Sequence, residues 1–269
     1  NLQQQLVEIG YQGKKLEELE GLSATEKAKM LFIVQDPYTS YYDAKVVRDF
    51  VALTQKLGFS PIILPFKPNG KAMHIKGFLA RFSKTAKTQA EFLNRVAKLN
   101  VPLVGVDPAI VLSYRDEYKE ALGDSRGDFH VLTAHEWLTN QLESNALQSA
   151  VKNIAKSDHT FEWHLFPHCT ESTFMPNSPK EWQHIFAQFG QTLKVEKVGC
   201  CGMAGVFGHE VQNQTMSKDI YDVSWGKKLQ GKDPNHCLAT GYSCRSQVKR
   251  YEKAILKHPV QALLEVLNN

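Results

Sequence analysis

Several features are missing from this sequence, and each absence excludes a class of protein. No apolar run approaches the roughly 18 residues of a transmembrane helix, and no signal peptide is visible. Lys and Arg are dispersed and the net charge is only +4, so nucleic acid is not an expected partner. No G-x-G-x-x-G motif stands between a strand and a helix, so no flavin or nicotinamide site is indicated. We expect a soluble cytoplasmic protein that associates with a membrane, if at all, through its partners.

Cysteine is scarce and unevenly placed. The five cysteines all lie in the last hundred or so residues: Cys169, Cys200, Cys201, Cys237 and Cys244. An odd number of cysteines without an export signal argues against a disulfide scaffold and favours metal or redox chemistry. The chain also begins with Asn1 rather than Met, so we expect a fragment of a longer polypeptide.

Short apolar runs alternate with helical patterns through most of the 269 residues. The predicted strands cover residues 30–34, 61–66, 101–106, 129–132, 161–166, 192–198 and 237–240. The predicted helices cover about 43–57, 72–82, 88–99, 109–122 and 134–155. Continuous apolar strands separated by helices are typical of parallel βαβ units. The sequence therefore predicts an α/β, Rossmann-like fold with parallel sheets.

The second half of the chain repeats the first. A shift of 132 residues places Gly58 on Gly190 and Gly70 on Gly202 without a gap, and core-facing apolar positions coincide. We interpret this as an internal duplication, although any two βαβ units share some apolar rhythm. The predicted domains are a helical lead-in at 1–29, a cysteine-free repeat at 30–127 and a thiol-bearing repeat at 128–269. We expect the first repeat to be a structural partner that binds no metal.

The adjacent pair Cys200 and Cys201 is followed at once by Gly202. A disulfide between adjacent cysteines is strained, so thiol–disulfide chemistry is the least expected use. Two thiolates turned toward one soft, multi-atom ligand suit the pair better, because glycine lets the backbone approach such a ligand. An iron–sulfur cluster is such a ligand. The alternative is that both are small buried residues that happen to be neighbours.

The predicted topology brings the thiols of the second half together. Cys169 follows its first predicted strand, Cys200 and Cys201 follow the second, and Cys244 follows the third. Ligands of open parallel sheets bind beyond the carboxyl ends of the strands, so four thiols should meet at one edge. Cys237 begins its strand, and we expect it nearer the opposite edge as a buried structural residue. The less favoured alternative is that residues 241–243 fold back and Cys237 also reaches the metal.

Two histidines are placed close to the predicted site. His168 adjoins Cys169, and His209 follows the glycine turn. Such histidines can ligate metal, donate a hydrogen bond to cluster sulfur or carry protons. An ordinary structural role is the alternative for both, and it is the interpretation we favour for His236.

Four segments of the second half resemble a known family. They read P-H-C-T-E-S at 167–172, G-C-C-G-M-A-G-V-F-G-H-E at 199–210, A-T-G-Y-S-C-R-S-Q at 239–247 and H-P-V-Q-A-L-L at 258–264. They are similar to the cysteine-rich CCG domain that heterodisulfide reductases, the iron–sulfur part of glycolate oxidase and lactate-utilisation proteins share. The set is more similar still to the C-terminal region of bacterial FAD-linked oxidases of the D-2-hydroxyglutarate or D-lactate dehydrogenase type. The likeness covers about 30–269 and is weak in the first half.

This resemblance implies an iron–sulfur electron-transfer part of an FAD-linked 2-hydroxyacid dehydrogenase. A cluster, 4Fe-4S for a four-thiolate site, would be held and tuned by Cys169, Cys200, Cys201, Cys244, Gly202, His168 and His209. Its partners would be flavin and ferredoxin-like domains of the same polypeptide and an acceptor such as a quinone. No catalytic residue is assigned to this chain, so we expect no oxidation of a 2-hydroxy acid by the chain alone.

One departure from the family pattern affects the expected ligand set. The typical closing motif is C-x-x-C, but Gly241 takes the place of its first cysteine, ahead of Cys244. A five-thiolate cluster is therefore not expected. A different class of function also stays open, in which the thiols bind zinc in a structural or docking module without redox activity.

Overall fold

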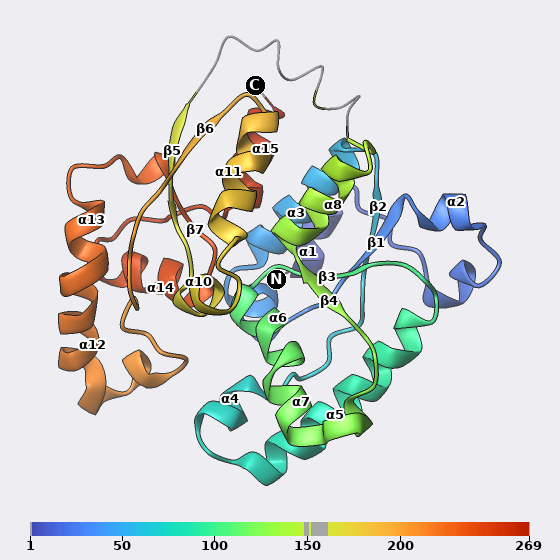
Figure 1. Ribbon diagram of the computed structural model, residues 1–269, viewed down its shortest axis with the longest axis horizontal. Coiled ribbons are helices and arrows are strands. Elements are labelled where there is room, and N and C mark those ends of the chain that lie inside the picture. Colours follow the sequence, from blue (N-terminus) through green and yellow to red (C-terminus); the bar gives the residue numbers. More distant parts are fainter. Residues whose placement is uncertain (1, 148–150, 152–160, 269) are drawn as a thin grey trace. The chain divides into compact units, whose positions relative to one another are not determined.

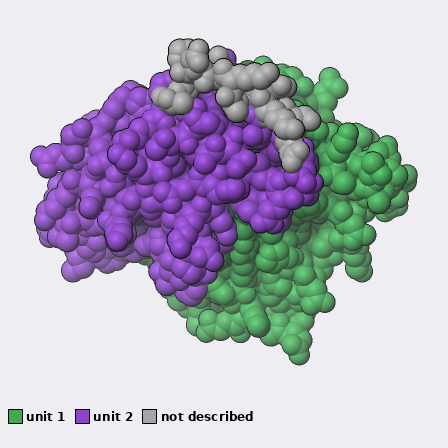
Figure 2. Space-filling view, turned by 45° about the horizontal axis from the view of Figure 1, so that its top comes forward, with its two compact units in different colours: residues 1–137 green, residues 138–269 purple. Residues whose placement is uncertain are grey.

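The computed structural model describes residues 2–147, 151 and 161–268. The chain divides into two compact units, residues 1–137 and residues 138–269, which Figure 2 colours separately. We call them unit 1 and unit 2. Each is built around a parallel sheet with helices, so the predicted α/β class is confirmed. None of the helices in these described ranges is long and apolar enough to cross a membrane.

The sheet of unit 1 has four parallel strands in the order β2, β1, β3, β4 (Figure 1). Their bounds are Ser60–Ile63, Met30–Ile33, Leu103–Gly105 and Val131–Thr133, respectively. Every residue of β1 is buried, because β1 lies inside the sheet and helices cover its faces. The larger helices are α3 (Ala44–Lys56), α5 (Leu79–Ala97), α6 (Pro108–Arg115) and α7 (Glu117–Leu122). Shorter helical elements are η2 (Tyr38–Tyr42), α4 (Lys71–Ile75) and η3 (Gly123–Arg126).

The lead-in consists of α1 (Leu2–Glu8), the turn η1 (Leu16–Leu19) and α2 (Ala24–Lys27). Ser23 and Glu26 form a capping box that starts α2. Leu19 is fully buried in the core of unit 1, and the Tyr11 hydroxyl accepts a hydrogen bond of 2.9 Å from the Ile63 amide. The lead-in therefore packs as part of unit 1.

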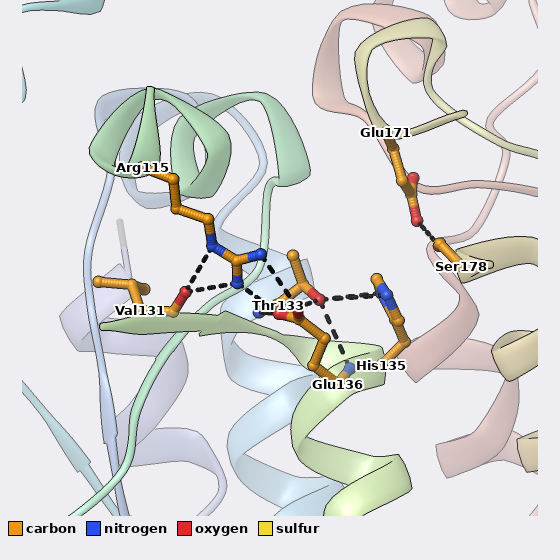
Figure 3. A network of polar contacts seen from close by, with 7 residues as sticks. All are labelled: Arg115, Val131, Thr133, His135, Glu136, Glu171 and Ser178. Carbon is orange, nitrogen blue, oxygen red and sulfur yellow. Dashed lines mark hydrogen bonds and ion pairs between the residues drawn. The ribbon is translucent and has the colours of Figure 1, made fainter. Parts of the chain in front are cut away.

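Strand β4 belongs to the sheet of unit 1, where it pairs with β3. Arg115 anchors it by donating to the Val131 carbonyl at 2.7 Å and to the Glu136 carboxylate (Figure 3). Glu136 also accepts from the Thr133 amide, at the start of α8 (Ala134–Glu143). The chain divides into its two units between Trp137 and Leu138, and the predicted domain boundary at 127/128 stays a prediction. The rest of the helix predicted at 134–155 lies largely outside the described residues.

Among its described residues, unit 2 has a sheet of three parallel strands in the order β6, β5, β7 (Figure 1). Their bounds are Thr192–Val195, Glu162–Phe166 and Cys237–Ala239. The helices are α10 (Cys169–Phe174), α11 (Ser178–Gln188), α12 (Gln214–Tyr221), α13 (Lys227–Leu229), α14 (Tyr242–Tyr251) and α15 (Pro259–Val266). The short turns are η4 (Phe207–His209), η5 (Val211–Asn213), η6 (Asp222–Gly226) and η7 (Pro234–His236). β6 ends three residues before its predicted end at 198, so a long loop carries Cys200.

The two sheets share one strand order, because β2, β1 and β3 correspond to β6, β5 and β7. Gly58 and Gly190 both have positive φ, +86° and +69°, just after α3 and α11. Gly70 and Gly202 also share positive φ, +78° and +84°, in the loops after β2 and β6. We interpret these shared features as the internal duplication that the sequence indicates.

Candidate thiol site in unit 2

The elements of unit 2 place four cysteines beyond the carboxyl ends of its strands. Cys169 is the first residue of α10, which follows β5, and Cys244 lies in the first turn of α14, which follows β7. Cys200 and Cys201 lie in the loop after β6. Cys201 and Cys244 are buried, whereas Cys169 and Cys200 are half-buried. The site is therefore open to solvent on the side of Cys169 and Cys200.

The four thiols interact with one another in pairs. Cys169 hydrogen-bonds with Cys200, Cys200 with Cys201, and Cys201 with Cys244. The charge of Cys244 also acts on Cys169. Thiols from three separate loops thus form one connected group, which we call the thiol group.

Hydrogen bonds within the thiol group favour the thiolate form of Cys200. Hydrogen bonds from Cys169, from Cys201 and from the amides of Gly202 and Ala204 lower the pKa of Cys200 to about 2. The hydrogen bond to Cys200, followed by burial, raises the pKa of Cys169. Hydrogen bonds with Cys200 and Cys244, together with burial, raise the pKa of Cys201. A stabilised thiolate is the form of cysteine that binds soft metal centres.

The loop after Cys201 turns backbone amides toward the sulfurs. Gly202, Ala204 and Gly205 have positive φ of +84°, +40° and +70°. The Gly202 amide donates to Cys200 Sγ at 3.3 Å. Successive amides that point at one place form a concave site that favours anions, including thiolates and iron–sulfur clusters. Ala204 is strained in this region, and such strain is concentrated at functional sites.

Hydrogen bonds from helices α12 and α14 hold the loop after Cys201 in place. The Ser217 hydroxyl donates to the Gly202 carbonyl at 2.7 Å, and the Gln247 amide donates to the Cys201 carbonyl at 2.9 Å. Gln247 also donates to the Ser217 hydroxyl at 2.9 Å. A Cβ atom on Gly202 would lie 2.1 Å from the Ser217 carbonyl oxygen. Only glycine therefore fits at this position.

A buried hydrogen-bond chain joins α10 to the end of β7. The His168 amide donates to the Thr240 hydroxyl at 2.9 Å, and that hydroxyl donates to the Glu171 carboxylate. Glu171 also accepts from the Ser178 hydroxyl (Figure 3). Arg245 donates to the Ala239 carbonyl at 2.9 Å. These bonds fix the starts of the two helices that carry Cys169 and Cys244.

His168 is buried beside Cys169, and both of its ring nitrogens have partners. Its Nδ1 accepts from the Thr170 amide at 3.2 Å, and its Nε2 lies 3.2 Å from the Ser243 hydroxyl. A Cβ atom on Gly241 would lie 2.3 Å from His168 Cδ2. The imidazole therefore fills the space that a side chain at position 241 would need. Position 241 is where the C-x-x-C motif would place a fifth cysteine.

The remaining residues considered in the sequence analysis, His209 and Cys237, have surroundings that differ from those of the thiol group. His209 is exposed at the end of η4, and its role stays a prediction. Cys237 is fully buried at the start of β7, and burial raises its pKa to about 11. Within the described ranges, the groups whose charges act on Cys237 are Lys232, Asp233 and Glu196, and none of them is a thiol. Cys237 thus belongs to the same buried core as Cys201 and Cys244, but no thiol is among the groups that act on its ionisation.

No three His, Cys, Asp or Glu side chains in 2–147, 151 and 161–268 are arranged to hold a single metal ion. The four thiols are nevertheless linked to one another by hydrogen bonds and charge. The donor set, sulfurs with backbone amides directed at them, is of the kind that binds soft metal centres.

Sequence reasoning missed the polar residues that support the site. Glu171, Ser217, Thr240 and Gln247 are all buried, and each bonds to an element distant in sequence. Glu171, Thr240 and Gln247 lie inside the motifs quoted above, at positions that a packed helix or strand would bury. A polar residue at such a position was the signal from which the supporting role could have been predicted.

The fold and the site together define an α/β protein with two parallel-sheet units of similar strand order and a thiol group in one of them. No family model matches the chain. Over 267 residues the chain is 81% identical to a D-2-hydroxyglutarate dehydrogenase of Haemophilus influenzae and 56% identical to one of Escherichia coli K12. Each match covers 99% of this chain but only 26% and 25% of the respective relative. The chain thus spans about a quarter of the length of these relatives.

A more distant relative shares the same region. One subunit of the anaerobic glycerol-3-phosphate dehydrogenase of Escherichia coli K12 is 22% identical over 241 residues. The match covers 86% of this chain and 57% of that subunit. The chain is therefore similar to parts of two differently named dehydrogenases.

Proposed function

We propose that this chain is the iron–sulfur electron-transfer part of an FAD-linked dehydrogenase that acts on D-2-hydroxyglutarate or a related D-2-hydroxy acid. The single observation that carries the proposal is the thiol group, in which four cysteines from three loops of unit 2 interact. The similarity to D-2-hydroxyglutarate dehydrogenases supports the class of substrate. The distant similarity to part of another dehydrogenase supports a module shared between oxidoreductases.

Cys169, Cys200, Cys201 and Cys244 would hold the cluster, and a count of four thiolates favours 4Fe-4S. When bound, the cluster supplies one-electron transfer. The hydrogen bonds that lower the pKa of Cys200 stabilise the thiolate form, which is the form of cysteine that binds metal. Amide donation from the loop after Cys201 stabilises negative charge on the sulfurs. The half-exposed Cys169 and Cys200 mark the side on which an electron partner approaches.

His168 takes a positioning role in this proposal. Both of its nitrogens are engaged, so it holds the start of α10 through Thr170 and contacts α14 through Ser243. The ring also closes the position of a fifth cysteine at residue 241. A four-thiolate site agrees with this packing, whereas a five-thiolate cluster would need the ring to move.

The rest of the expected machinery belongs to the remaining three quarters of the relatives' length. There we place the flavin domain, the ferredoxin-like segment and the oxidation of the hydroxy acid, and we place this chain in the C-terminal part. Electrons would leave through this chain toward an acceptor such as a quinone. Cytoplasmic localisation and association with a membrane through partners also belong to this proposal.

The test is metal analysis of the protein purified without oxygen. Iron, acid-labile sulfide and the visible spectrum are measured for the wild type and for Cys169→Ala, Cys200→Ala, Cys201→Ala and Cys244→Ala. We expect iron with sulfide in the wild type and the loss of most iron in each variant. Cys237→Ala is the matched control, because Cys237 is also buried in unit 2 but is not coupled to the other described thiols. It should keep the iron content of the wild type.

Two results would contradict the proposal. Stoichiometric zinc without sulfide would make the chain a structural or docking module. Iron that survives the four substitutions but is lost in Cys237→Ala would place the cluster elsewhere. Circular dichroism of each variant checks that unit 2 is folded, so that loss of iron can be assigned to the ligand and not to unfolding.

A further inference from the structure

Basic residues are concentrated in one segment of unit 1. Between residues 67 and 98 the sequence has eight Lys or Arg residues and a single acidic residue, Glu91. The formal net charge of the whole chain is only +4, so the remaining residues together carry a net negative charge. The segment includes α4 and α5. The positive charge of this protein is therefore local to the part of unit 1 that these two helices form.

The turn between α4 and α5, drawn in turquoise, exposes two large apolar side chains that are neighbours in the chain (Figure 1). Gly77, with φ of +76°, follows α4, and the Phe78 amide donates to the Met73 carbonyl at 2.9 Å. Helix α5 then begins at Leu79. Phe78 is 56% exposed and Leu79 is 59% exposed. An adjacent pair of this kind at a turn is available to a surface outside the chain.

Exposed cations accompany this apolar pair. Arg81, Lys84 and Lys87 lie on one face of α5, because residues three positions apart in a helix project from the same side. The Arg81 guanidinium lies 5.8 Å from the centre of the Phe78 ring. Arg81, Lys84 and Lys87 form no ion pair with another residue that the structure describes. Their charges are therefore available to an anionic partner.

The combination of apolar and basic side chains distinguishes between anionic partners. The headgroups of an anionic bilayer attract Lys and Arg, and the boundary below them accepts apolar side chains. The long stems of Lys and Arg let the charges stay among the headgroups while shorter apolar side chains lie deeper. Nucleic acid also attracts cations through its phosphates, but it offers no apolar layer to an aliphatic side chain such as Leu79. An anionic bilayer therefore fits this surface better.

We propose that unit 1 docks directly on a bilayer that contains anionic lipid, through a surface that we call the α4–α5 corner. Its residues are Lys76, Phe78, Leu79, Arg81, Lys84 and Lys87. The two apolar side chains enter the bilayer surface, and the four cations contact the headgroups. So few contacts give a reversible attachment, unlike a membrane-spanning helix. The inference does not rest on the proposed function, because it uses no metal and no residue of the thiol group.

The test is co-sedimentation of the full chain with large vesicles at about 0.1 M salt. Vesicles of phosphatidylserine and phosphatidylcholine are compared with vesicles of phosphatidylcholine alone. We expect the chain to bind the anionic vesicles more strongly and to be released as the salt concentration rises to about 0.5 M.

Two double variants separate the apolar contribution from the basic one. Phe78→Ser with Leu79→Ser should weaken binding to anionic vesicles by at least about tenfold. Lys84→Gln with Lys87→Gln should weaken it by about 25-fold, which is about fivefold for each charge. Lys14→Gln with Lys15→Gln is the matched control, because it removes the same charge from two exposed lysines of unit 1 outside the corner. We expect this control to change binding by less than about twofold.

A second measurement follows the ring itself. In Phe78→Trp the added tryptophan emission should move to shorter wavelengths on anionic vesicles, because the indole leaves water. Emission that does not move would overturn the proposal. Circular dichroism checks that each variant is folded.

Three results of the sedimentation assay would also overturn it. They are no binding of the wild type at the lower salt concentration, equal binding to anionic and neutral vesicles, and equal binding of the wild type and the Phe78→Ser, Leu79→Ser variant. Binding to duplex DNA without binding to vesicles would assign the α4–α5 corner to nucleic acid instead. Because the vesicle assay needs no iron, its outcome is independent of the metal analysis that tests the thiol group.

Discussion

Replacing Gly202 with alanine adds one methyl group and tests how closely the loop of the thiol site packs against α12. In Gly202→Ala the new Cβ would lie 2.1 Å from the Ser217 carbonyl oxygen and 3.0 Å from its carbon. Both atoms belong to the backbone of α12, so no side-chain rotation relieves the contact. Either α12 or the loop after β6 must move by about 1 Å to restore a normal separation.

The loss of unfolding free energy in Gly202→Ala has three contributions. A non-glycine residue at φ +84° costs about 1–2 kcal/mol. Moving the loop weakens the hydrogen bonds from Ser217 to the Gly202 carbonyl and from Gln247 to the Cys201 carbonyl, at about 1 kcal/mol each. The lower entropy of the unfolded alanine chain returns less than about 1 kcal/mol. From these parts we expect unit 2 to lose about 3 kcal/mol of unfolding free energy.

The assay is urea unfolding followed by the fluorescence of the buried tryptophans of unit 2. Gly199→Ala is the matched control in the same loop, because its Cβ would meet nothing closer among the described residues than the Ser224 hydroxyl at 3.6 Å. We expect this control to change the unfolding free energy by less than about 1 kcal/mol. Equal effects of the two substitutions would refute the packing argument. Metal analysis of Gly202→Ala should show reduced iron, since the displaced amides no longer face Cys200.

Two further predictions concern other parts of the chain. The pKa of Asp36, raised from 3.8 to about 6, means that folded unit 1 holds a proton that the unfolded chain releases. The free energy of unfolding should therefore fall by about 3 kcal/mol as pH rises from about 4 to about 6. Urea midpoints of Asp36→Asn should not show this fall. An equal fall in both proteins would contradict the argument. Gly241→Ala should destabilise unit 2 by about 1–2 kcal/mol, because its Cβ meets the His168 ring. Adding His168→Ala should recover part of that loss in a double-mutant cycle, and purely additive effects would exclude the contact.

The convergence of the thiols illustrates what could be predicted. The carboxyl ends of parallel strands share one edge of a sheet, so the positions of Cys169, Cys200 and Cys244 after three predicted strands sufficed to place them together. Cys237 was assigned away from them by the same rule, and the charges that act on it come from other kinds of side chain. Strand ends were less accurate, since β6 stops at Val195. Strand ends depend on pairing with a neighbour, which a single segment does not encode.

The sequence by itself determined the α/β class, the repeated pattern of strands and helices, and the group of cysteines that could share one ligand. These features follow from local periodicity and from the topology of parallel sheets. Only the tertiary structure decided that hydrogen bonds lower the pKa of Cys200 and that His168 fills the space beside Gly241. It also decided that Asp36, Asn69 and Asp107, which follow strands of the cysteine-free unit, are buried. The physical reason is that these properties depend on burial and on contacts between residues about 70 positions apart, as in the bond from His168 to Thr240.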